Sequence, residues 1–278
     1  MAKVVGSFAA SHAPNIARAW NELKDETRAW LTEHYGELGR RVKALDPDVL
    51  VVHSNDHWIN FFLNNIPTFC IGIGDEHDPP PEPFMKGLFT QEHLPGHAGL
   101  GRHLLNYALN ADFDPSYSQR AMIDHGIGIP IWRMGFDEVP AIVPVFVNLV
   151  EPPFPTPRRC LAWGHMIRDA IEAYPEDLRV VVLGTGGLSH SIGEPTMGDI
   201  DEPFDHACIE MFQTGKSDAE IAASLDRMLA QTGNGGAELR SWCIAHAAAG
   251  GKGFDLIGYT PMPETLIGCG VAEWKMAA

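Results

Sequence analysis

Four histidines of this chain stand just after apolar or extended runs, where a strand gives way to a loop. They are His12 in SFAASHAPN, His57 in VHSNDHW, His125 in AMIDHGIGIP and His190 in LGTGGLSHS. Imidazole is the commonest protein ligand for transition metals, and its pKa lets it exchange a proton near neutral pH. Metal binding and acid–base catalysis are therefore the two kinds of chemistry that these residues suggest.

A carboxylate would complete one kind of metal site. Non-haem Fe(II) sites commonly combine two histidines with one carboxylate and leave other positions open. We expect Glu238, in TGNGGAELRSWCIAH, to be this carboxylate. Glycines at positions 233, 235 and 236 allow a tight turn before a helix whose first turn carries the acid. Taken singly, each histidine could also be a loop residue that only makes hydrogen bonds. Glu238 could also be an acid that stabilises a helix N-terminus and has no role in a site.

An alternation of strands and helices must position these residues. Continuous apolar runs, typical of strands covered on both faces, occupy residues 4–8, 49–53, 68–73, 141–147, 180–183 and 266–271. Helices are expected at residues 16–45, 99–109, 159–174, 205–214, 218–230 and 237–249. The pattern predicts a single α/β domain over residues 1–278, with a central mostly parallel or mixed sheet flanked by helices on both faces. Ligands of such sheets bind beyond the carboxyl ends of the strands, so the histidine loops should meet there.

Composition excludes several classes of function. Among 278 residues, 20 are basic and 36 acidic, and no basic stripe occurs, so we expect no nucleic-acid partner. No apolar run is long enough to span a bilayer, and the N-terminal MAKVVGSFAASHAP predicts a strand rather than a signal peptide. The five cysteines lack CxxC spacing, which argues against a structural zinc site and a disulfide framework. We therefore expect a soluble, cytoplasmic protein with no membrane partner.

Five motifs, in order along the chain, resemble those of the LigB-like (class III) extradiol ring-cleavage dioxygenases. They are SHAP, NDHW, DHG, GTGGLSHS and GGAELRSW. The resemblance covers nearly the whole chain and is nearest to the catalytic subunit of protocatechuate 4,5-dioxygenase and to gallate and methylgallate dioxygenases. It implies His12, His57 and Glu238 as ligands of one Fe(II). It also implies His190 as the catalytic acid/base and His125 as the second histidine of the pocket.

The resemblance further implies that the protein opens the ring of a small aromatic diol by inserting both atoms of O2. We expect Trp58, Thr260 and Glu264 to contact this substrate. Glu264 stands where carboxylate-binding relatives offer serine and asparagine, and an acid there would repel a substrate carboxylate. This favours a methoxylated, amino-substituted or pyridine-derived ring over simple protocatechuate. We also expect a homo-oligomer, and a small accessory subunit stays open because some relatives carry an additional helical domain.

Two other functions stay open. A zinc-dependent hydrolase could use the same two histidines and glutamate, with a metal-bound water as nucleophile. A non-enzymatic binding module of the same fold is the third alternative, although the intact set of His12, His57 and Glu238 speaks against it. Metal analysis and oxygen uptake with catechols would distinguish the three.

Overall fold

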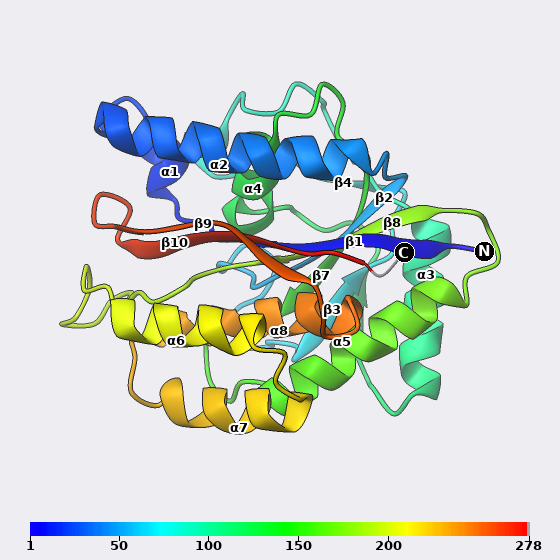
Figure 1. Cartoon of the computed structure of the whole chain (residues 1–278). Coiled ribbons are helices and arrows are strands. Elements are labelled where there is room, and N and C mark those ends of the chain that lie inside the picture. The colour runs from blue at the N-terminus through cyan, green and yellow to red at the C-terminus, as the bar shows by residue number, and fades with distance from the viewer. Residues whose placement is uncertain (277–278) are drawn as a thin grey trace.

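A mixed sheet of eight strands forms the centre of the computed structural model, which describes residues 1–276 (Figure 1). The strands lie in the order β6-β3-β7-β2-β8-β1-β10-β9. They are β1 (Lys3–Ala10), β2 (Val49–Ser54), β3 (Phe69–Gly72), β6 (Ser116–Ser118), β7 (Ala141–Val147), β8 (Arg179–Thr185), β9 (Phe254–Met262) and β10 (Ile267–Trp274). Strands β7, β2, β8 and β1 are parallel, whereas β3 pairs with β7, and β10 with β1 and β9, in antiparallel fashion. The predicted α/β class with a mixed sheet is confirmed.

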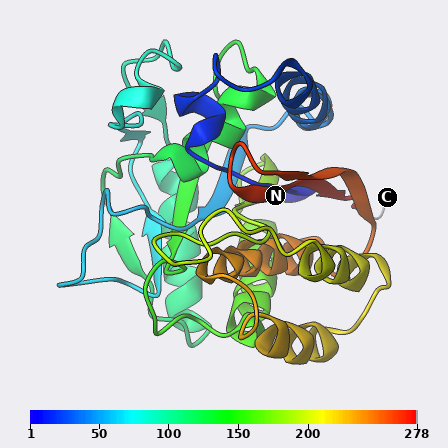
Figure 2. The same cartoon turned by 90° about the vertical axis from the view of Figure 1, so that its left-hand side faces the viewer.

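Helices cover both faces of this sheet (Figures 1 and 2). Above it in Figure 1 lie α1 (Asn15–Arg18), α2 (Asp25–Ala44) and α4 (His125–Met134). Below it lie α3 (Ala98–Asn110), α5 (Pro157–Glu172), α6 (Glu202–Gln213), α7 (Asp218–Met228) and α8 (Leu239–Ala248). A small hairpin of β4 (Glu76–His77) and β5 (Leu94–Pro95) and the 3-10 helices η1 (Pro83–Met85) and η2 (Asn234–Glu238) complete the described elements. Among residues 1–276, no helix is both long and apolar enough to cross a membrane.

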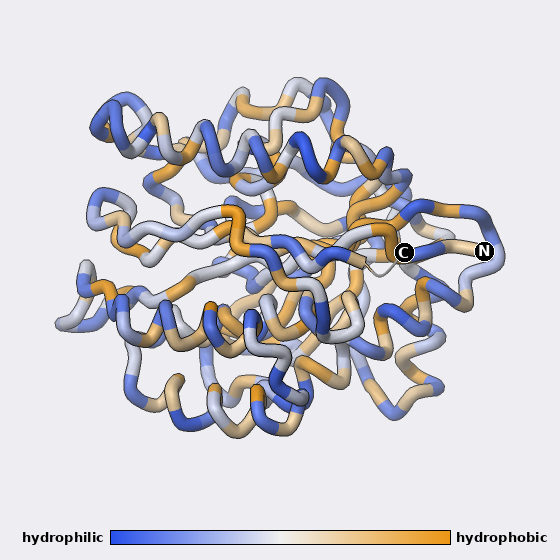
Figure 3. Tube along the Cα trace, in the orientation of Figure 1, coloured by the Kyte–Doolittle hydropathy of each residue, from blue (hydrophilic) through white to orange (hydrophobic). Residues whose placement is uncertain are grey.

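The two helical layers explain why the strands are apolar at consecutive positions. Val49 and Val51 of β2 belong to the core beneath the sheet, and Leu50 and Val52 belong to the core above it. Side chains alternate between the faces of a strand, so a strand covered on both sides needs apolar residues throughout. Figure 3 shows this arrangement, with hydrophobic segments inside and hydrophilic helix surfaces outside.

Three elements differ from the prediction. The helix expected over residues 16–45 is divided into α1 and α2. The segment after Asp124 forms α4 despite Pro130, because the side chain of Asp124 accepts a hydrogen bond from the backbone of Gly126 and caps the helix. Strand β9 was not predicted, because it lies at the sheet edge, mostly half-buried, and lacks a continuous apolar run.

The parallel strands β1, β2 and β8 are neighbours and end at the same edge of the sheet. Figure 2 looks onto this edge, where the loops after these strands gather. The predicted meeting of the histidine loops therefore has its structural basis in three adjacent parallel strands.

Candidate active site

The carboxyl edge of the sheet brings together all five residues predicted for metal binding and catalysis. His12, His57 and His190 follow β1, β2 and β8, His125 is the first residue of α4, and Glu238 is the last residue of η2. All five line one cavity of about 310 Å³. Four of them are buried, and 15% of the His57 side chain is exposed.

His12, His57 and Glu238 turn their polar atoms toward one point. Nε2 of His12 lies 3.2 Å from Nε2 of His57, and Oε1 of Glu238 lies 3.5 and 3.8 Å from these two nitrogens. Donor atoms bound about 2.1 Å from one metal at tetrahedral or right angles stand about 3.0 to 3.4 Å apart. The three atoms are therefore close to the spacing that a shared metal ion requires.

Asp124 fixes the orientation of His57. Its Oδ2 accepts hydrogen bonds from Nδ1 of His57 at 2.9 Å and from the backbone N–H of His57 at 2.7 Å. Because Nδ1 carries the proton, Nε2 is left as a lone pair on the cavity side, as metal-binding histidines need. Asp124 was not among the predicted site residues. The only signal for it was its position directly before His125 in the DHG motif.

Glu238 is held by two further donors. Nδ2 of Asn55 donates to Oε1 at 2.9 Å, and the backbone N–H of Gly187 donates to Oε2 at 2.6 Å. Gly186 has a φ of 138°, and a Cβ at this position would lie 2.6 Å from the Cβ of Glu238. The first glycines after β8 thus let the chain turn and pass closely against the carboxylate.

The electrostatics of the site favour a positive charge between these groups. Burial opposes the ionisation of Glu238, but His12 and His190 outweigh it and hold the pKa of the carboxyl well below its usual range. Burial also opposes the charged form of His57, but Asp124 and Glu238 outweigh it and raise its pKa to about 10. A metal ion would supply the same charge while leaving the imidazole neutral, so these residues fit a metal.

His125 offers a second candidate set of ligands. The ring nitrogens of His12, His57 and His125 can all lie within 4.8 Å of one another. Nδ1 of His125 is 2.9 Å from Oε1 of Glu82, which leaves Nε2 free. His12 and His57 therefore belong to both sets, and the third ligand is Glu238 or His125. Two histidines with a carboxylate are typical of non-haem Fe(II), and three histidines of some catalytic zinc sites.

The tautomer of His190 is fixed by the backbone. Its Nδ1 lies 3.1 Å from the carbonyl oxygen of Leu188, which can only accept, so Nδ1 carries the proton. In the neutral ring Nε2 is therefore the unprotonated nitrogen, and it lies 3.8 Å from Oε2 of Glu238. Gly235 packs against the ring so closely that a Cβ there would lie 2.2 Å from it. This geometry gives His190 a basic nitrogen beside the candidate metal ligands.

Asp205 anchors the loop that carries His190. Its carboxylate accepts hydrogen bonds from the backbone N–H and the hydroxyl of Ser189, at 2.7 and 2.9 Å, and from the hydroxyl of Tyr259 at 2.8 Å. Burial is the main reason that the pKa of Asp205 is raised to about 6. The sequence offered no signal for this residue, which lies on α6, one turn into the helix.

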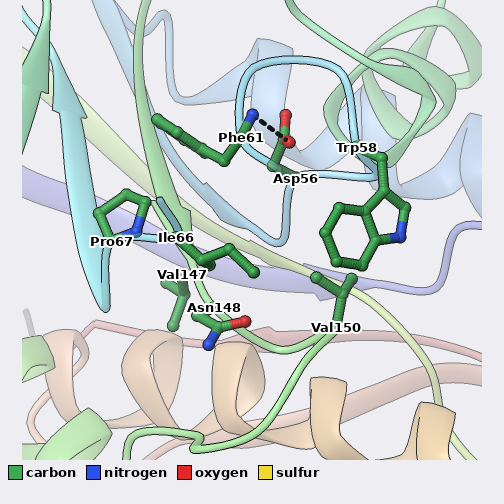
Figure 4. Close-up of a pocket in the computed structure, with 8 residues that line it drawn as sticks. All are labelled: Asp56, Trp58, Phe61, Ile66, Pro67, Val147, Asn148 and Val150. Carbon is green, nitrogen blue, oxygen red and sulfur yellow. Dashed lines mark hydrogen bonds between the residues drawn. The ribbon is translucent and has the colours of Figure 1, made fainter. Parts of the chain in front are cut away.

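The three residues expected to contact substrate do not line this cavity. Trp58 borders a separate small hollow, beside Asp56 and Val150 (Figure 4). Thr260 and Glu264 border another hollow, and the carboxylate of Glu264 accepts hydrogen bonds from the backbone of Lys24 and the hydroxyl of Thr27. Glu264 does not line the cavity, so the structure does not support the expected repulsion between Glu264 and a substrate carboxylate.

The rest of the cavity lining comes from three segments, two of which begin within the SHAP and GTGGLSHS motifs. Residues 13–18, 191–197 and 265–267 contribute Ala13, Pro14, Asn15, Arg18, Ser191, Ile192, Met197, Thr265, Leu266 and Ile267. Most of these side chains are apolar, as expected of a pocket for an aromatic ring.

Comparison with known proteins places this site in a family. Residues 6–268 match the family described as the catalytic LigB subunit of aromatic ring-opening dioxygenase. The chain belongs to the LigB family. The resemblance inferred from the motifs is confirmed, and this LigB protein is an extradiol ring-cleavage dioxygenase for catechol-type substrates.

Relatives of this LigB protein include enzymes named 2,3-dihydroxyphenylpropionate/2,3-dihydroxicinnamic acid 1,2-dioxygenase. The one from Rhodococcus rhodochrous is 24% identical over 315 residues, with 96% of each chain covered. The one from Paraburkholderia phymatum is 26% identical over 280 residues, covering 83% of this chain and 85% of the relative. A solved structure, reported as the crystal structure of uncharacterized protein JW3007 from Escherichia coli K12, has a TM-score of 0.64 at 13% identity and covers 97% of this chain and 99% of its own. That likeness supports the fold.

Proposed function

We propose that this LigB-family enzyme binds Fe(II) through His12, His57 and Glu238 and opens the ring of a small aromatic diol. The observation that carries the proposal is the convergence of two imidazole nitrogens and one carboxylate oxygen, 3.2 to 3.8 Å apart, at the buried end of the cavity. Two neutral histidines and one carboxylate leave a net charge of about +1 on Fe(II), which suits a doubly deprotonated diol. Residues 1–278 act as one catalytic domain in this proposal.

Fe(II), when bound, supplies a Lewis acid that acidifies the diol hydroxyls and a redox centre for O2. Nε2 of His190 accepts a hydroxyl proton from the substrate, because the bond from Nδ1 to the carbonyl of Leu188 keeps Nε2 free for it. His190 returns this proton as the ring opens. His125 lines the same cavity with Nδ1 bonded to Glu82, so its Nε2 is the atom available to an oxygen of the substrate.

The size of the cavity supports a single-ring substrate. Its volume of about 310 Å³ is at the lower end of the range for small-molecule pockets, roughly 300 to 1,000 Å³. The names of the relatives point to the same class, since 2,3-dihydroxyphenylpropionate is a single-ring diol. The proposed partners are therefore a small aromatic diol and O2, and the expected homo-oligomer can be checked by light scattering after gel filtration.

Anaerobic purification, metal analysis and oxygen consumption test the proposal. Oxygen uptake is measured after Fe(II) loading with catechol, protocatechuate, gallate, 3-O-methylgallate, 2-aminophenol, dihydroxypyridines and 2,3-dihydroxyphenylpropionate. His57→Ala should abolish both iron retention and ring cleavage, whereas His190→Ala should retain iron and lose most turnover. His93→Ala, at a partly exposed histidine outside the cavity, is the control and should change neither. Normal iron content and activity in His57→Ala would contradict the proposal.

A zinc-dependent hydrolase is a second candidate, favoured by the three imidazoles of His12, His57 and His125. The third ligand distinguishes the two. Under the iron proposal Glu238→Ala loses the metal and His125→Ala retains it, whereas a three-histidine zinc site predicts the reverse. Zinc in the anaerobically purified protein, together with no oxygen uptake on any diol, would favour the hydrolase.

A further inference from the structure

Arg18 lies at the exposed end of the candidate active-site cavity. It is the last residue of α1, six residues after His12, and it lines the same cavity as the four histidines and Glu238. Its side chain is exposed, whereas His12, His190 and Glu238 are buried. The cavity therefore has a buried end with the candidate metal ligands and an open end with a guanidinium.

The guanidinium of Arg18 has no partner of its own. Across residues 1–276, the structure gives this side chain neither a hydrogen bond nor an ion pair within 4 Å. Glu22 and Glu264 border the adjoining hollow with Arg18 without reaching that distance. Of the residues that line the cavity in the described chain, Arg18 is the only lysine or arginine. An unpaired cation at a pocket mouth is notable in a protein with a net charge of −16.

Much of the cavity wall is apolar. Ile192, Met197 and Leu266 line it, and the side chains of Ile192 and Met197 are more than half exposed. An aromatic ring with a short aliphatic chain matches such a wall. A planar guanidinium in turn matches a carboxylate, because it can donate two parallel hydrogen bonds to the two oxygens.

We propose that Arg18 binds a carboxylate that the substrate carries on the side of the ring away from the two hydroxyls, and so selects anionic aromatic diols. The inference rests on the proposed function, because the diol must be held at the histidine end for the carboxylate to reach Arg18. It differs from the sequence-based expectation that Glu264 would repel a substrate carboxylate, because Arg18 would attract one at the cavity mouth.

Two substrates that differ in charge, and otherwise only by a methyl group, test the role of Arg18. They are 3-(2,3-dihydroxyphenyl)propionate and its methyl ester. The wild-type enzyme should have a higher kcat/KM for the acid, and Arg18→Gln should lower that value about tenfold, mainly through KM, while the ester changes by less than about twofold. Arg18→Lys should recover part of the loss, and added NaCl should reduce the preference for the acid, because the mouth of the cavity is open to solvent.

Arg102→Gln is the matched control. Arg102 is an exposed arginine of α3, at the opposite end of the molecule from α1 in Figure 1, and its loss changes net charge equally. This variant should keep the wild-type preference for the acid. Thermal melting of Arg18→Gln should match the wild type, because the side chain is exposed.

Equilibrium binding separates this inference from the proposed function. Calorimetry under nitrogen compares the affinities for the acid and the ester without turnover. Tighter binding of the acid by the wild type, lost in Arg18→Gln, supports the role of Arg18 even if no diol is oxidised, in which case only the proposed reaction fails. If the wild type and Arg18→Gln bind the acid with the same affinity and turn it over with the same kcat/KM, the role of Arg18 is overturned. The proposed ring cleavage is not affected by that result.

Discussion

Asp124→Asn should weaken metal binding while leaving the fold in place. The substitution changes one buried oxygen into an NH2 group beside Nδ1 of His57, now 2.9 Å from the carboxylate. Asparagine is as good a helix cap as aspartate, so the bond to the backbone of Gly126 and the start of α4 should persist. The carboxylate of Asp124 caps the helix with Oδ1 and accepts the hydrogen bond from Nδ1 of His57 with Oδ2. The asparagine amide has a single oxygen and cannot fill both positions. His57 therefore loses the partner that keeps its proton on Nδ1.

The expected effect is a loss of about 10- to 100-fold in metal affinity, the usual range when a partner of a metal-binding histidine is removed. This corresponds to about 1.4 to 2.8 kcal/mol. Two features of the structure place Asp124 in this range: it makes two hydrogen bonds to His57, and it is completely buried. The negative charge that attracts a cation to the site is lost as well.

The assay is a metal-binding titration against a chelator of known affinity, with the melting temperature of the metal-free protein measured in parallel. Asp205→Asn is the control, since Asp205 is equally buried but contacts Ser189 and Tyr259 rather than a candidate ligand. It should keep the wild-type metal affinity. Unchanged affinity in a folded Asp124→Asn variant would refute the orienting role, and equal losses in both variants would show a general effect of removing buried charge.

Three other predictions concern His190, Asp205 and the packing of α2 against α4. Gly235→Ala places a Cβ 2.2 Å from His190 and should reduce turnover at least tenfold while iron content stays normal. Burial raises the pKa of Asp205 to about 6, so the folded protein holds this proton more tightly than the unfolded chain does. The contribution of Asp205 to the free energy of unfolding should therefore fall by about 2 to 3 kcal/mol as the pH rises from about 4 to 6. Urea unfolding at several pH values, with Asp205→Asn as the comparison, measures this fall. Gly39→Ala should lower the free energy of unfolding by about 1 to 3 kcal/mol, because the new Cβ would lie 2.1 Å from a backbone carbonyl oxygen of α4. Gly36→Ala has room for its Cβ on the same helix and should leave the stability unchanged or raise it.

The sheet and the meeting of three histidines at one of its edges could be predicted because they follow from local patterns. Burial on both faces makes β1, β2 and β8 continuously apolar, and each of these strands is followed directly by a loop with a histidine. Parallel neighbours then bring His12, His57 and His190 to one edge of the sheet. The sequence pattern therefore identifies residues that lie within a few positions of the end of a buried strand.

The residues that were missed depend on contacts between distant segments. Glu82 reaches His125 from 43 positions away, and Asp124 reaches His57 from 67 positions away. Arg18 lies in a helix that was expected to continue into α2, which would have placed it on an ordinary helix surface. Thr260 and Glu264 border a different hollow beside Thr27 and Trp30 of α2, whereas residues 265–267 of the same hairpin line the cavity.

The supporting carboxylates divide the site into parts that can be perturbed separately. Asp124 orients His57, Glu82 bonds His125, and Asp205 holds the loop of His190, so each of three histidines depends on its own buried or half-buried acid. Loss of Asp124 should therefore appear in metal affinity. Loss of Glu82 or Asp205 should appear in turnover at normal metal content, because neither contacts His12, His57 or Glu238. A change in metal affinity in the Glu82→Gln variant would mean instead that His125, rather than Glu238, completes the metal site.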